Sequence, residues 1–255
     1  GEVAHVEGSV DPVRDMELVE TELLLADIAS LERRIEGLTK RARGGDGEAK
    51  AQLALIERIL PDIQAGRPAR SLELTPEERA RVSTLQLLTA KPILYVCNVD
   101  EASAARGNAF SAAVAAQAAA VGAGTVVISA AIEAEVAALA PADRLEYLHS
   151  LGLEQPGLDR VIMAGHRLLD LITFFTAGPK EARAWTIGRG TRAQDAAGVI
   201  HSDFKRGFIC AEVASWDEFV RHGGEVGTRE AGRLRQEGRD YIIQDGEVVR
   251  FRFNV

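Results

Sequence analysis

Residues 91–101 read KPILYVCNVDE, and residues 125–129 read TVVIS. Each stretch contains a continuous run of apolar, partly β-branched residues, which is typical of a strand buried on both faces of a parallel sheet. The segment between them is rich in alanine and has the composition of a helix. The order strand, helix, strand predicts a parallel βαβ unit and therefore an α/β fold.

The region before this unit is predicted to be helical. Apolar residues recur at steps of four and three in two segments, at Leu24, Ile28, Leu31, Ile35 and Leu38 and again at Ala49, Leu53, Ile56, Leu60 and Ile63. Each segment has a narrow apolar seam of the coiled-coil type. The glycine-rich residues 44–47 lie between the seams, so the pattern predicts an antiparallel helical hairpin. A third helix is expected from Thr75, whose capping-box partner is Glu78, to near Ala90.

The last third of the chain has the sequence pattern of short strands instead of long helices. Short apolar runs separated by glycines predict strands at residues 173–176, 184–187 and 208–211. Apolar and polar residues alternate over residues 249–255, which predicts a strand with one buried and one solvated face. The dipeptide at 245–246 is Asp-Gly and predicts a hairpin turn before that strand. A small α+β domain is expected here.

Composition narrows the classes of function. The 255 residues are 46% hydrophobic and 27% charged, as in one large or two ordinary globular domains, and no stretch has the ~20 unbroken apolar residues of a membrane span. The net charge of −8 argues against nucleic-acid binding through bulk charge. Cys97 and Cys210, each among hydrophobic neighbours, predict a reducing compartment, hence the cytoplasm. A chain that begins with Gly1 instead of Met is expected to be a fragment.

Polar or small residues follow both predicted parallel strands. Asn98, Val99 and then Glu101 follow the first strand, and Ser129 and Ala130 follow the second. In parallel α/β sheets, ligands bind beyond the carboxyl ends of the strands. These residues are therefore placed to read a nucleotide base, as the N-K-x-D and S-A-K loops of GTPases do. The alternative is an ordinary turn.

The residue types favour adenine over guanine. The Asp of N-K-x-D accepts hydrogen bonds from two donors on the edge of guanine, and adenine lacks both. Here the corresponding residue is Glu101, which is one methylene longer. The amide of Asn98 can donate to a ring nitrogen and accept from the exocyclic amine of adenine. An adenine nucleotide is therefore the predicted ligand.

Longer motifs identify a family. The chain resembles the YchF / Obg-like ATPase family over essentially all its length, through KPILYVCNVDE at 91–101, SAAIEAE at 129–135, GLDRVIMAG at 157–165, FFTAGPKEARAWT at 174–186 and DYIIQDGEVVRFRFNV at 240–255. The resemblance implies a P-loop nucleotide domain with an inserted helical hairpin, followed by a β-grasp-like TGS domain. It assigns residues 1–10 and 89–150 to the nucleotide domain, 11–88 to the hairpin, 151–171 to a connecting helix and 172–255 to the TGS domain.

The resemblance also implies an activity, with one large departure. Family members hydrolyse ATP with Mg²⁺ and associate with the ribosome, so the large subunit or ribosomal RNA is the implied partner. No G-x-x-x-x-G-K-[ST] motif occurs in these 255 residues. The phosphate loop and the Mg²⁺ ligands are thus expected outside them, and the chain is expected not to hydrolyse ATP alone.

One further residue is assigned a catalytic role by the resemblance. His5 matches a histidine that the family places on a mobile loop. An imidazole that reaches the γ-phosphate can position or deprotonate the attacking water. The remaining histidines and cysteines lack the spacing of a metal site, so no metal ligand is predicted.

Positive charges gather near the predicted hairpin turn, at Arg33, Arg34, Lys40, Arg41 and Arg43. Such a cluster can contact ribosomal RNA by neutralising phosphates. The alternative is a solvated helix end. Arg250 and Arg252, on the polar face of the last strand, form a smaller second patch. The competing function is therefore a non-catalytic ribosome- or RNA-binding module of helical arm and TGS domain, and neither DNA nor a membrane is an expected partner.

Overall fold

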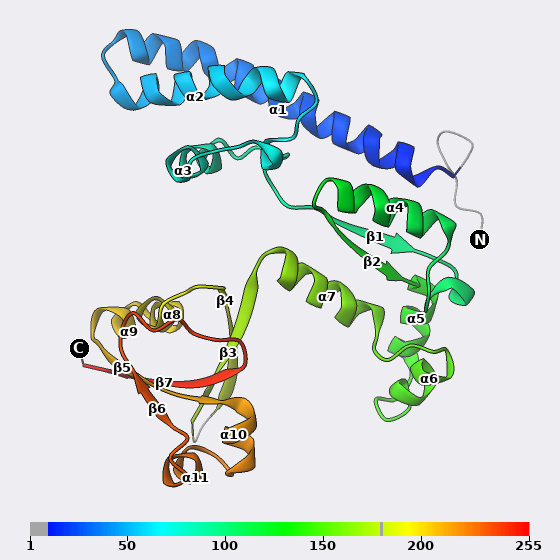
Figure 1. The fold of residues 1–255 in the computed structure, drawn as a ribbon, viewed down its shortest axis with the longest axis vertical. Coiled ribbons are helices and arrows are strands. Elements are labelled where there is room, and N and C mark those ends of the chain that lie inside the picture. Colours follow the sequence, from blue (N-terminus) through cyan, green and yellow to red (C-terminus); the bar gives the residue numbers. More distant parts are fainter. Residues whose placement is uncertain (1–9, 179–180, 255) are drawn as a thin grey trace. The chain divides into compact units, whose positions relative to one another are not determined.

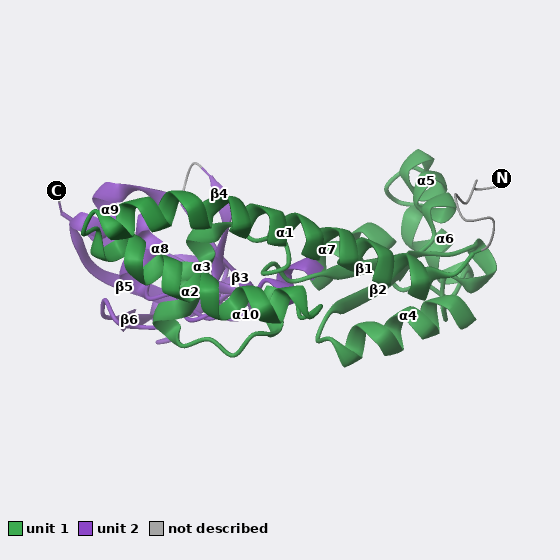
Figure 2. Cartoon of the chain, turned by 90° about the horizontal axis from the view of Figure 1, so that it is seen from above, with its two compact units in different colours: residues 1–164 green, residues 165–255 purple. Residues whose placement is uncertain are grey.

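The computed structural model describes residues 10–178 and 181–254. The chain divides into two compact units, Gly1–Ala164 and Gly165–Val255 (Figure 2). The first unit contains α1 (Pro12–Arg43), α2 (Gly47–Gln64), η1 (Ala69–Ser71), α3 (Pro76–Leu85), β1 (Leu94–Asn98), η2 (Glu101–Ser103), α4 (Ala109–Ala120), β2 (Gly124–Ile128), α5 (Ala130–Ala138) and α6 (Arg144–Ser150). Helix α7 (Gly157–Leu168) starts in this unit and continues into the second.

Helices α1 and α2 form an antiparallel hairpin (Figure 1). Asp11 caps the start of α1, and Asp46 caps the start of α2 after the glycine turn. The two apolar seams face each other in one core, in which Leu31, Ile56 and Ile59 are at most 1% exposed. The hairpin expected from the seam spacing is therefore present.

Helix α3 ends at Leu85, earlier than the expected end near Ala90. The reason is Gln86, which adopts a left-handed backbone conformation with φ of 56° and stops the helix. The chain beyond it lies against α1, where the carboxylate of Asp27 is buried. Asp27 accepts hydrogen bonds from the backbone N–H of Leu88 (2.7 Å), the backbone N–H of Thr89 (2.8 Å) and the Thr89 hydroxyl (2.7 Å).

Strands β1 and β2 pair in parallel, in register from Leu94↔Gly124 to Asn98↔Ile128, with α4 between them in sequence. The predicted βαβ unit and the α/β class are confirmed. Because the two strands are in register, their carboxyl ends lie side by side. The residues that follow them, at 98–101 and 129–130, are therefore neighbours.

The second unit is a mixed sheet in the order β4-β3-β7-β5-β6. Its elements are β3 (Leu171–Ala177), β4 (Ala182–Gly188), α8 (Ala193–Ile200), α9 (Ser202–Arg206), β5 (Phe208–Ser215), α10 (Trp216–Arg221), α11 (Glu225–Glu230), β6 (Arg235–Glu237) and β7 (Glu247–Phe253). Ile172, Phe174 and Phe251 pack with Ala193 and Ala197 of α8 in one core. This is the expected α+β, β-grasp-like arrangement.

The terminal hairpin expected at 245–246 is wrong. The residues before this turn do not pair with β7; instead Ile242 forms a bridge with Arg192. Strand β7 lies in the middle of the sheet, parallel to β3 and antiparallel to β5. Its first three residues are buried, as befits a central strand. Within the described residues, no helix has the length and apolar character needed to cross a membrane.

Candidate functional site

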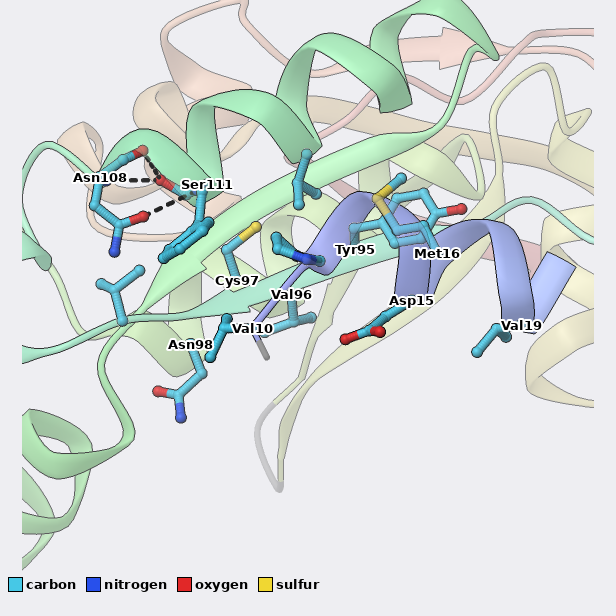
Figure 3. A pocket seen from close by; sticks show the side chains of 14 residues that line it. Val10, Asp15, Met16, Val19, Tyr95, Val96, Cys97, Asn98, Asn108 and Ser111 are labelled. Carbon is cyan, nitrogen blue, oxygen red and sulfur yellow. Dashed lines mark hydrogen bonds between the residues drawn. The ribbon is translucent and has the colours of Figure 1, made fainter. Parts of the chain in front are cut away.

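The ends of β1 and β2 are tied together by the side chain of Asn98. Its Oδ1 atom accepts a hydrogen bond from the backbone N–H of Ala130 at 2.9 Å. The backbone N–H of Val99 donates to the carbonyl of Ile128 at 2.9 Å. The structure therefore brings together four of the residues expected to read a base, and Figure 3 shows Asn98 at the end of its strand.

The contact with Ala130 limits what Asn98 can recognise. The amide oxygen uses one of its two lone pairs for Ala130, and the two N–H donors of Nδ2 in this exposed side chain have no partner among the described residues. A donor at this position matches the N7 acceptor, which adenine and guanine share. Asn98 is thus suited to binding a purine, and the contact with N7 by itself does not distinguish adenine from guanine.

Glu101 lies apart from the Asn98 contact. It begins η2, which Asp100 caps by accepting a hydrogen bond from the backbone N–H of Ser103 at 2.9 Å. The pKa of Tyr147 in α6 is raised, mainly by its hydrogen bond to Glu135 and in smaller part by the charge of Glu101. The Glu101 carboxylate is therefore near α6, and it accepts no hydrogen bond from the described part of the chain.

Ser129 is an unsatisfied polar group at the same place. It is 1% exposed, and its hydroxyl has no hydrogen-bond partner among the described residues. It precedes α5 but makes no capping bond with its side chain. Buried hydroxyls are normally hydrogen-bonded, so Ser129 marks an open hydrogen-bonding position beside Ala130.

A cavity of about 460 Å³ adjoins this region on the α4 side (Figure 3). Residues of β1, the start of α1 and the start of α4 line it, among them Val96, Asn98, Met16 and Phe110. Cys97 is part of the same wall, and burial raises the pKa of its thiol. Because the thiolate is the reactive form, Cys97 is expected to be a poor nucleophile at neutral pH.

Behind the base-reading residues, α5 holds the first turn of α7. The Glu133 carboxylate accepts hydrogen bonds from the backbone N–H of Gly157 (2.6 Å) and of Leu158 (3.1 Å). A Cβ atom on Gly157 would lie 2.7 Å from Glu133 Oε1 and 3.0 Å from Ile128 Cγ2, so glycine permits this close approach. Both residues lie in the quoted motifs, but no spacing rule connects positions 133 and 157.

The Glu133 contact gives a first prediction. Glu133→Ala is expected to lower the free energy of unfolding by about 1–3 kcal/mol, because two N–H groups at a helix start lose a charged acceptor. Amide hydrogen exchange at residues 157–158 should accelerate. Glu154→Ala, on an exposed residue of the loop before α7, serves as the control and should change neither. Equal effects of the two variants on exchange would show that the contact does not hold α7.

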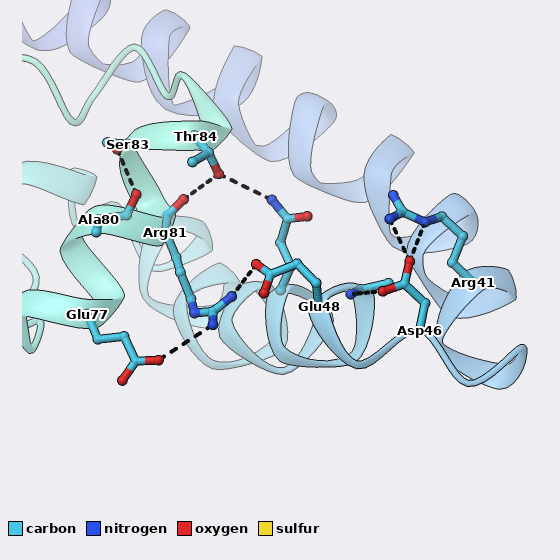
Figure 4. A network of polar contacts seen from close by, with 10 residues as sticks. Arg41, Asp46, Glu48, Glu77, Ala80, Arg81, Ser83 and Thr84 are labelled. Carbon is cyan, nitrogen blue, oxygen red and sulfur yellow. Dashed lines mark hydrogen bonds and ion pairs between the residues drawn. The ribbon is translucent and has the colours of Figure 1, made fainter.

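Four of the five basic residues near the hairpin turn already have a partner within the described residues. Lys40 pairs with Glu36 at 2.7 Å, and Arg41 pairs with Asp46 at 2.6 Å (Figure 4). The pKa of Asp46 is lowered by its hydrogen bond from the backbone of Ala49 and then by Arg41. Arg33 and Arg34 donate to backbone carbonyls, whereas Arg43 has no partner within the described residues.

The arginines of the second basic patch form ion pairs with two glutamates. Arg250 pairs with Glu225 at 2.6 Å, and Arg252 pairs with Glu212 at 3.2 Å. Arg229 contacts both of these carboxylates. Arg250 and Arg252 lie on the polar face of β7 as expected, and each is paired there with a carboxylate from α11 or β5.

His5, the histidine expected to be catalytic, lies outside the described residues. Among residues 10–178 and 181–254, no group of three His, Cys, Asp or Glu side chains could hold a metal ion.

Comparison with known proteins gives consistent matches. The family model YchF-GTPase_C, described as a protein of unknown function (DUF933), matches residues 171–254. A protein of Haemophilus influenzae named ribosome-binding ATPase YchF is 48% identical over 254 residues, covering 100% of this chain and 70% of the relative. Its namesake in Bacillus subtilis is 43% identical over 255 residues, with 99% and 70% covered. Obg-like ATPase 1 of Oryza sativa subsp. japonica is 38% identical, with 100% and 65% covered.

A solved structure agrees with these relatives. The YchF GTPase of Schizosaccharomyces pombe superimposes with a TM-score of 0.84 at 31% identity, covering 98% of this chain and 68% of that one. A GTP-binding protein of Pyrococcus horikoshii, at 17% identity and a TM-score of 0.62, shares the fold alone. On the strength of the full-length identity to its relatives and of this superposition, the chain belongs to the YchF / Obg-like ATPase family.

Proposed function

We propose that this chain supplies the base-reading and ribosome-contacting parts of an ATPase that works in the cytoplasm. The observation that carries the proposal is the hydrogen bond from Ala130 to Asn98. It fixes the amide at the joint end of two parallel strands and leaves its two N–H donors without a partner among the described residues. The names of the bacterial relatives, ribosome-binding ATPase, support both the reaction and the partner.

In this proposal the residues of the chain bind and orient ATP. Asn98 donates to the N7 atom of adenine, the backbone at Val99, Ser129 and Ala130 surrounds the base, and the buried Ser129 hydroxyl offers one more polar contact. Glu101, turned toward α6, leaves the purine edge that a guanine-reading carboxylate would occupy. ATP is then preferred over GTP because no acceptor faces the two donors of guanine.

Hydrolysis is proposed for a chain as long as its relatives. This chain covers 70% of their length, and its sequence holds no phosphate-loop motif. When bound, Mg²⁺ neutralises charge on the phosphates, but the described residues hold no metal site, so no catalytic step is assigned to them through it. His5 is the proposed water-orienting residue. Positioning and charge neutralisation dominate such reactions, since little covalent chemistry is required.

Calorimetry and phosphate release test this function. A chain extended to the length of its relatives should bind ATP more tightly than GTP and release phosphate, and His5→Ala in that chain should slow release without weakening ATP binding. The 255 residues alone should release none. Tighter binding of GTP, or no binding of either nucleotide by the extended chain, would refute the assignment.

The second candidate is a ribosome-binding module without nucleotide chemistry. It is favoured by the hairpin and the C-terminal unit each having a hydrophobic core of its own. Co-sedimentation of the extended chain with ribosomes, measured with and without ATP, decides between them. A module should bind ribosomes equally with and without ATP, whereas the ATPase reading expects the affinity of the extended chain to change with ATP.

A further inference from the structure

A hollow of about 290 Å³ lies on one side of the helical hairpin. It is lined by Arg33, Arg34, Gly37, Leu38 and Arg41 of α1 and by Gln52 of α2. Three of these described lining residues are cations and none is an anion. A concave surface of this composition attracts an anionic group, in a chain whose overall charge is negative.

The three guanidinium groups are each fixed by one edge. Arg33 donates through Nε to the carbonyl of Ala29 (3.1 Å), and Arg34 donates through Nη2 to the carbonyl of Leu85 (3.1 Å). Arg41 donates through Nε and Nη2 to Asp46 (Figure 4). Each guanidinium therefore keeps further N–H donors for a ligand while its position is already restrained. Such restraint lowers the entropy lost on binding.

Gly37 lines the hollow and has no side chain to fill it. Glycine inside a helix is less stable than alanine, yet Gly37 lies inside α1, six residues before its end at Arg43. A Cβ atom at this position would meet no atom of the described chain within 4 Å. A longer side chain at position 37 would therefore extend into open space beside the arginines and fill the hollow without changing any charge.

We propose that this hollow binds a phosphate group of the ribosomal RNA backbone. The inference rests on the proposed ribosome contact. It reduces the basic residues that touch the ribosome from five to three, Arg33, Arg34 and Arg41. Guanidinium groups match phosphate oxygens in bidentate geometry, and several arginines around one hollow suit a phosphate better than a single carboxylate. Arg43 and Lys40, which do not line the hollow, then contribute only through general charge.

The test compares two variants that each lose one positive charge, Arg33→Ala and Arg43→Ala, with Gly37→Leu, which changes no charge. Binding of the 255-residue chain to ribosomes is measured over a series of KCl concentrations. Arg33→Ala is expected to weaken binding about tenfold and to reduce the salt slope by about one, as the loss of one phosphate contact does. Gly37→Leu should weaken binding about as much at every salt concentration. Arg43→Ala, the control with an equal charge change, should weaken it less than threefold, and circular dichroism checks that each variant keeps its helices.

A labelled RNA duplex separates failure of this proposal from failure of the proposed function. If ribosomes bind but Gly37→Leu and Arg33→Ala behave like Arg43→Ala, the hollow is not the contact, whereas the ribosome association stands. If ribosomes do not bind but the duplex does, and Gly37→Leu abolishes this, the phosphate site stands without the ribosome. If ribosome binding depends on Gly37 while the duplex never binds, the contact is with ribosomal protein and the RNA proposal is wrong. Binding of neither ligand overturns both proposals.

Discussion

Replacing Asn98 by alanine is expected to weaken ATP binding by about ten- to a hundredfold, because the variant loses the donors that face the base. The free energy of unfolding should change by less than about 1 kcal/mol, since the side chain is exposed and the N–H of Ala130 can turn to water. Calorimetric titration of the chain extended to the length of its relatives measures the first quantity, and urea denaturation measures the second.

A second variant separates the two roles of this amide. Asn98→Asp keeps an acceptor for the N–H of Ala130 but has no donor for the base, so it should bind ATP as weakly as the alanine variant. Because N7 is common to both purines, the ratio of ATP to GTP affinity should be the same before and after either change. Unaltered ATP affinity in both variants would remove Asn98 from the site.

The largest loss of stability is expected from Asp27→Ala. The Asp27 carboxylate is 2% exposed and accepts three hydrogen bonds from residues 61 and 62 positions later in the chain. Its removal leaves buried N–H and O–H groups without an acceptor, which is expected to lower the free energy of unfolding by about 3–5 kcal/mol. Urea denaturation of the 255-residue chain at 25 °C checks this value.

Glu32→Ala is the matched control for Asp27. It removes an exposed carboxylate from the same helix, whose hydrogen bond from Gln64 is long at 3.3 Å, and should cost less than about 0.5 kcal/mol. Thr89→Val removes one of the three donors to Asp27, which keeps the other two. Its loss of unfolding free energy should lie between the losses of Asp27→Ala and Glu32→Ala. A loss for Asp27→Ala no larger than that for Glu32→Ala would mean that the buried carboxylate is not needed for stability.

Structural features that depend on the local spacing of apolar residues were predictable from the sequence. The parallel pairing of β1 with β2 follows from two short apolar runs joined by one helix, and the register found in the structure brings Asn98 near Ala130. The hairpin follows from its two seams in the same way. In each case the partners are specified by hydrophobic spacing, which a single sequence displays.

Features that depend on distant partners were not predictable. In the sequence, Asp27 resembles any polar residue beside the apolar seam of α1. Its burial could not be predicted because its hydrogen-bond donors come from a loop far along the chain. Strand β7 alternates like an exposed hairpin strand, although its neighbours β3 and β5 place it in the middle of the sheet. The sequence shows the number of arginines near the turn, but only the structure shows that three of them line one hollow.

The position of Asp27 within α1 also has a mechanical consequence. The helix continues without interruption from Asp27 to Arg43, a distance of about 24 Å at a rise of 1.5 Å per residue. The buried carboxylate thus anchors the middle of a stiff helix, with the arginine hollow toward the C-terminal end of that helix. A tilt of about 5° at Asp27 would move the end of the helix by roughly 2 Å, which is enough to break or make a hydrogen bond. Small adjustments in the chain that leads into β1 would therefore be amplified at the arginine hollow.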